Sequence, residues 1–132
     1  MIRNDFYIVV NNEPWFVTIF LPRTRWAVNE IMSALSSIGI SNENAKITLE
    51  NLMSGRINNG ITFSNEMYRK TISVWDKAAT KEDWLDLITH ELHHLSVHIA
   101  SANGLDLSGE EVCYINGGIA KHLYNTIKRL II

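Results

Sequence analysis

The sequence predicts a single α+β domain in which pairs of strands alternate with helices. Two segments rich in β-branched and aromatic residues open the chain, and two more lie between residues 60 and 75. Apolar residues at helical spacing follow each pair of segments. The chain has 132 residues, of which 46% are hydrophobic and 20% charged, enough for one core in a compact globular protein. We therefore expect one domain over residues 1–132 with a small, mostly antiparallel sheet.

The first pair of segments is expected to form a hairpin. Residues 6–10 and 15–20 are the strands, and Asn11-Asn12-Glu13-Pro14 is the turn between them. Two helices should follow, over residues 27–38 and 41–54, because their apolar residues recur every three or four positions. Gly39 is expected to end the first helix.

Residues 60–63 and 70–75 are expected to form a second hairpin through residues 64–66. A long helix should then begin with a capping box at Thr80-Lys81-Glu82-Asp83 and end near residue 102, before Asn103-Gly104. A second capping box, Ser108-Gly109-Glu110-Glu111, is expected to open a final helix that continues to about residue 130.

The long helix carries the motif His90-Glu91-Leu92-His93-His94, which reads H-E-x-x-H. On a helix, His90 and His94 lie about 6 Å apart along the axis and about 40° apart around it, so both imidazoles can reach one metal ion. Histidine nitrogens at this spacing are typical zinc ligands. Glu91 lies at the flank of the same face, where it can deprotonate a water held by the metal.

The rest of this helix is expected to face the core through an apolar stripe, and the motif lies beside that stripe. The stripe consists of Trp84, Ile88, Leu92, Leu95 and Ile99. His93 points to the far side of the helix and is expected to be exposed. His98 lies about 12 Å from His90 along the axis, so it cannot share a metal with it; we expect it to support the site or to pack the helix.

The final helix is expected to fold back against the motif helix after the short loop over residues 103–107. Gly117 and Gly118 lie on the same side of it as the glutamates near its start. Because glycine has no side chain, the pair should permit a close approach of the two helices.

A catalytic zinc commonly has three protein ligands, so a third ligand is needed. A histidine six residues after His94 would supply it in some zinc peptidases, but that position is Ala100. The remaining candidates are Glu110 and Glu111, and helical periodicity does not separate them. Glu111 stands three residues after Ser108 and is the expected partner in the capping box, which favours Glu110 as the ligand.

The motif followed by a glutamate-bearing helix resembles the gluzincins, the thermolysin-like zinc peptidases. The small size resembles their minimal forms, the minigluzincins, and short zincin-like proteins of phages and mobile elements. The resemblance covers roughly residues 72–120 and implies a minimal zincin-like fold in which the strand over residues 71–75 is the active-site edge strand. The chain departs from thermolysin at Tyr114, where thermolysin has an aspartate that supports a zinc histidine.

This resemblance implies a zinc metallopeptidase with His90, His94 and Glu110 as metal ligands and Glu91 as the catalytic base. Such an enzyme hydrolyses a peptide or protein substrate with a zinc-bound water that the glutamate activates. Tyr114 or His98 could donate to the oxyanion. The alternative is a non-catalytic zinc-bearing binding or regulatory module with the same fold.

Charge and cysteine content narrow the expected binding partners and cellular location of the protein. A net charge of −2 and a pI near 6.2 predict neither nucleic-acid nor membrane binding. Cys113 is the only cysteine, so no intramolecular disulfide can form. The first residues lack the layout of a signal peptide, and no apolar run approaches a membrane span. We expect a soluble, cytoplasmic protein.

Overall fold

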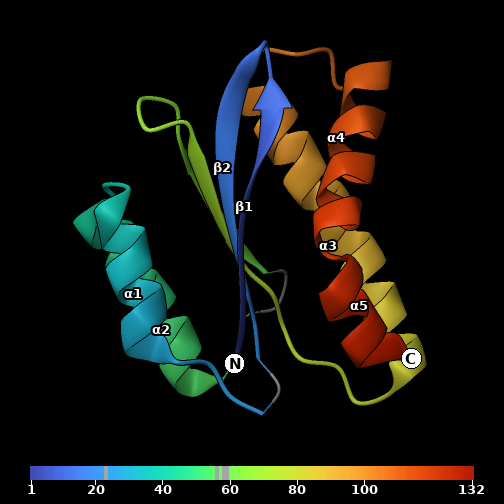
Figure 1. The fold of residues 1–132 in the computed structure, drawn as a ribbon. Coiled ribbons are helices and arrows are strands. Elements are labelled where there is room, and N and C mark those ends of the chain that lie inside the picture. Colours follow the sequence, from blue (N-terminus) through green and yellow to red (C-terminus); the bar gives the residue numbers. More distant parts are fainter. Residues whose placement is uncertain (23, 56, 58–59) are drawn as a thin grey trace.

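The computed structural model describes residues 1–22, 24–55, 57 and 60–132, and it shows an α+β protein (Figure 1). In chain order its elements are β1 (Ile2–Val10), β2 (Glu13–Leu21), α1 (Val28–Ser37), α2 (Asn42–Ser54), β3 (Ile61–Asn65), β4 (Lys70–Val74), α3 (Lys81–Ala102), α4 (Glu110–His122) and α5 (Tyr124–Ile131). Both expected hairpins and the expected order of strands and helices are confirmed.

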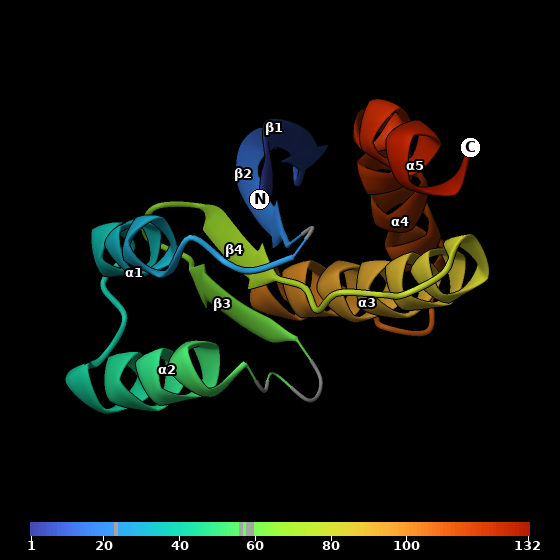
Figure 2. The ribbon, with the colours of Figure 1, turned by 90° about the horizontal axis from the view of Figure 1, so that it is seen from below.

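The four strands form one mixed sheet in the order β1-β2-β4-β3. Both hairpins are antiparallel, whereas β2 and β4 run parallel because α1, α2 and β3 lie between them in the chain. Helices α1 and α2 cover one face of the sheet, and α3, α4 and α5 cover the other (Figure 2). Each face has its own buried apolar cluster, one around Phe20 and Ile31 and the other around Ile19 and Leu95.

This order makes one expectation wrong: the strand over residues 71–75 is not an edge strand. Strand β4 pairs with β2 on one side and with β3 on the other, so its backbone groups are used within the sheet. The free edges belong to β1 and β3. Of these, β3 packs beside α3, the helix that carries the motif.

The first turn is shorter than expected, because only Asn11 and Asn12 form it. Both have a left-handed backbone, with φ of 53° and 64°, which suits asparagine and the tight turn of a two-residue hairpin. Glu13 and Pro14 belong to β2 instead. Proline is tolerated there because the pairing of β2 with β4 begins only at Phe16.

The helices α1, α2 and α3 begin and end within about a residue of their predicted positions. Ser41 and Thr80 cap α2 and α3, each accepting a hydrogen bond of 3.1 Å from the backbone three residues on. The predicted apolar stripe of α3 is buried, and His93 is exposed as expected. Within the described ranges, no helix combines the length and apolar character that crossing a membrane requires.

The prediction of one continuous final helix is wrong, because the chain leaves helical geometry at Leu123 and forms α4 and α5. The predicted capping box is also absent. Asp106 accepts hydrogen bonds from the backbone and hydroxyl of Ser108, at 3.0 and 2.8 Å, so that hydroxyl is used in a turn before the helix. Gly109 takes the N-cap position without a side-chain bond.

The expected role of the two glycines in α4 is wrong as well. A Cβ atom at Gly118 would lie 3.8 Å from Ile8 of β1, which is ordinary contact, and a Cβ at Gly117 would meet no atom within 4 Å in the part of the chain that the structure describes. Neither glycine is therefore needed for α4 to approach α3. Gly118 faces the sheet edge instead.

Candidate metal centre

The structure brings the side chains of His90 and His94 together on the exposed side of α3. Their Nε2 atoms are 3.1 Å apart, and their ring centroids are 4.6 Å apart. Two Zn–N bonds of about 2.0–2.1 Å at a tetrahedral angle hold their nitrogens about 3.3 Å apart. The observed separation therefore fits two ligands of one zinc ion.

Glu91 lies between α3 and the start of β3, with only 7% of its surface exposed. Burial raises the pKa of its carboxyl group; the imidazole of His90 opposes this, and the carboxylate of Asp76 adds to the rise. Its carboxylate is packed against Gly60, the residue before β3, since a Cβ atom placed there would lie 2.5 Å from Oε2. Glu91 is thus a buried carboxylate whose charge interacts with that of His90.

Strand β3 runs alongside α3 in the same direction. Gly60 lies against Glu91 at one end, and Ser64 contacts His98 at the other. From Gly60 to Ser64 the strand advances about 13 Å, and from Glu91 to His98 the helix advances about 10 Å. The similar lengths keep the two segments side by side. The edge strand β3 therefore flanks the face of α3 that carries Glu91.

His98 joins α3 to the sheet through a line of buried and half-buried polar groups. The indole of Trp15 donates to the Thr71 hydroxyl at 2.9 Å, and that hydroxyl lies 2.6 Å from the hydroxyl of Ser64. Ser64 Oγ in turn lies 2.9 Å from Nδ1 of His98. Burial lowers the pKa of His98 below the ordinary 6.5, so the ring is neutral at neutral pH. The ring tautomer decides whether Ser64 or His98 donates in their hydrogen bond. This contact agrees with the expected packing role.

We expect His98→Asn to make stability less sensitive to acid. The folded pKa of His98 is lowered, so its contribution to stability is complete above pH 6.5 and decreases as the pH falls below that value. Asparagine does not titrate and can keep the bond to Ser64. Urea unfolding between about pH 7 and pH 5 should show a smaller loss of unfolding free energy in this variant than in the wild type. His93→Asn, at an exposed position on the same helix, should follow the wild type; equal pH dependence of all three proteins would contradict the assignment.

The two candidate third ligands lie exposed at the start of α4. The carboxylate of Glu111 is folded against Gly109, where a Cβ atom would lie 2.8 Å from Oε2. Among the residues that the structure describes, no third histidine, cysteine, aspartate or glutamate joins His90 and His94 in one cluster. The third ligand therefore stays a prediction.

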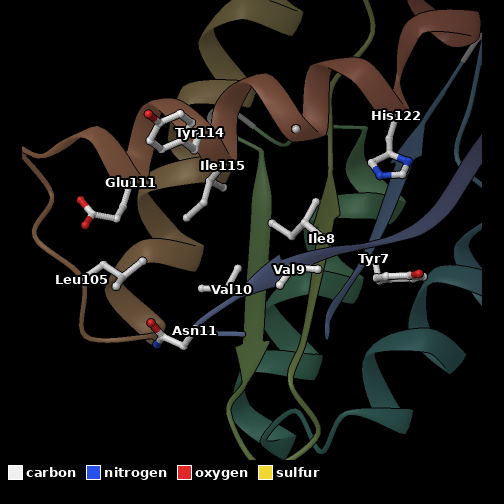
Figure 3. Close-up of a pocket in the computed structure, with 11 residues that line it drawn as sticks. Tyr7, Ile8, Val9, Val10, Asn11, Leu105, Glu111, Tyr114, Ile115 and His122 are labelled. Carbon is white, nitrogen blue, oxygen red and sulfur yellow. The ribbon is translucent and has the colours of Figure 1, made fainter. Parts of the chain in front are cut away.

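A separate cavity of about 640 Å³ lies between β1 and α4 (Figure 3). Its floor is apolar, with Ile8 and Ile115 among its lining residues, and Glu111 and Tyr114 border it on the α4 side. Tyr114 as a whole is 74% exposed. Two residues singled out from the sequence thus lie at this cavity, while Glu91 lies on the β3 side of α3.

Three residues near the candidate centre were not singled out from the sequence: Gly60, Ser64 and Asp76. Asp76 directly follows the predicted strand over residues 70–75, and a carboxylate at the end of a strand is a feature from which a residue near the site could have been predicted. Gly60 has a positive φ of 67°, which marks a special backbone position. No spacing rule connects these residues with α3, because the contacts depend on how β3 packs against the helix.

Comparisons with known proteins assign no family and no function to this site. No protein-family model matches the chain, and no curated protein and no solved structure matches it either. The interpretation of the site rests on its own residues.

Proposed function

We propose that this protein is a zinc-dependent metallopeptidase. The observation that carries the proposal is the pair of Nε2 atoms of His90 and His94, 3.1 Å apart, beside the buried carboxylate of Glu91. Structural zinc sites are usually closed and rich in cysteine, whereas this pair is exposed and has an acid–base group next to it. The combination favours hydrolysis over a purely structural zinc site.

In this proposal His90 and His94 would hold zinc through their imidazole rings, and Glu110 would be the third protein ligand. The preference for Glu110 is supported by the position of the Glu111 carboxylate, which is folded against Gly109. When bound, zinc supplies a Lewis acid that polarises the substrate carbonyl and acidifies water. Glu91 accepts the proton of the attacking water and returns it to the leaving amine.

The proposed substrate is an extended peptide or protein segment that pairs with the free edge of β3. From the sequence, residues 71–75 were expected to be the edge strand that binds the substrate. In this proposal β3 has that role, because it has an open edge and lies along α3. Main-chain hydrogen bonds to an edge strand bind an extended chain with little dependence on its sequence. The pairing would place the substrate backbone beside Glu91.

The test is cleavage of a mixed peptide library by the zinc-loaded protein. We expect cleavage to stop when a chelator removes the metal and to return when zinc is added back, because the water is too weak a nucleophile without it. Mass spectrometry of the library measures the products. Zinc binding without cleavage of any peptide would contradict the peptidase and support the non-catalytic zinc-bearing module.

A further inference from the structure

We infer that Gly60 is a positioning residue for Glu91: the absence of a side chain at residue 60 creates the space that the Glu91 carboxylate occupies between β3 and α3. The inference rests on the proposed function for its catalytic consequence. Its structural part concerns only the contact of these two residues, and it can be tested without zinc or substrate.

The geometry leaves no room for a larger residue. A Cβ atom at Gly60 would lie 2.5 Å from Oε2 and 3.1 Å from Cδ of Glu91, and 3.3 Å from the carbonyl oxygen of Val74. The Val74 carbonyl cannot move easily, because β4 is paired on both sides. Glu91 is itself buried, so its carboxylate can yield only by leaving its place beside His90.

The left-handed backbone of Gly60 does not explain the residue by itself. Gly55 and Gly104 have nearly the same conformation, with φ of 72° and 69° against 67° at Gly60, yet a Cβ at either would meet no atom of the described residues within 4 Å. Alanine at any of the three positions carries the strain of a positive φ. Only at Gly60 does it also collide with a functional side chain, so Gly55 and Gly104 are matched controls.

The first experiment measures stability of the zinc-free protein by urea unfolding. We expect Gly60→Ala to lower the folding equilibrium constant about tenfold more than Gly55→Ala or Gly104→Ala does. In a Glu91→Ala background this excess should shrink markedly, because the colliding carboxylate is gone and only the 3.3 Å contact with the Val74 carbonyl oxygen remains. An excess of equal size with and without Glu91 would overturn the inference. If Gly60→Ala does not fold, folding of the double variant supports the contact, and failure of both overturns it.

The second experiment measures the catalytic consequence. Gly60→Ala should keep one bound zinc and a KM near that of the wild type, while its kcat falls about 10- to 100-fold more than that of Gly55→Ala. A merely structural role would change kcat equally in both variants, and that result would contradict positioning. If the wild type cleaves no peptide, the proposed function fails, while the stability cycle still decides whether Gly60 makes the space for Glu91.

Discussion

Replacement of Glu91 by glutamine is expected to reduce peptide hydrolysis about 10²- to 10⁴-fold while zinc stays bound. Glutamine keeps the length and shape of the side chain, so it should fit the space beside Gly60. It cannot accept the proton of the attacking water. The loss should therefore appear in kcat, and zinc occupancy measured on the same sample should be unchanged.

The matched control is His93→Gln, which changes an exposed residue of the same motif helix. This variant should cleave the peptide library at the wild-type rate. Equal rates for the wild type and Glu91→Gln, at equal zinc occupancy, would remove Glu91 from the mechanism. Loss of zinc from Glu91→Gln would instead assign the carboxylate to metal binding.

Loss of either histidine is expected to abolish zinc binding at stoichiometric metal. His90→Ala and His94→Ala each leave only one histidine ligand on α3. Their zinc affinity should fall by more than the 10- to 100-fold that loss of a supporting residue causes. His93→Ala should bind zinc normally, because that side chain points away from the pair. Competition with a chromogenic chelator measures the affinities. Full occupancy in either of the first two variants would contradict the assigned metal centre.

The same titration ranks the two glutamates of α4. Glu110→Gln should weaken zinc binding strongly if Glu110 is the third ligand. Glu111→Gln should leave zinc affinity almost unchanged and reduce stability by about 0.5 kcal/mol, because a carboxylate in the first turn of a helix interacts favourably with its dipole. The reverse ranking would show that Glu111 is the ligand.

Features encoded by neighbouring residues could be predicted from the sequence. The start of α3 follows from the Thr80 hydroxyl and the backbone N–H of Asp83, which are three residues apart. The approach of His90 and His94 follows from helix geometry alone. The predicted capping box at the start of α4 is wrong because Asp106, which lies outside the four-residue pattern, accepts the hydrogen bond of the Ser108 hydroxyl.

Features that depend on packing could not be predicted in the same way. Whether residues 70–74 form an inner or an outer strand is decided by the parallel pairing of β2 with β4, which is a contact between distant parts of the chain. The same pairing determines that β3 lies beside α3 and that Gly60 meets Glu91. The sequence therefore identifies the motif, and the sheet order determines what surrounds it.

The two outer strands of the sheet differ in their protection against self-association. Strand β1 carries Arg3 and Asp5, which form an ion pair with a 2.7 Å separation, and such charges discourage edge-to-edge contact between molecules. Strand β3, with the sequence Ile-Thr-Phe-Ser-Asn, has no charged side chain. A strand that must accept an extended peptide cannot be blocked by charge or proline without losing that ability. If β3 binds the proposed substrate, access for that substrate and resistance to aggregation make opposite demands on these five residues, and their uncharged composition suits access.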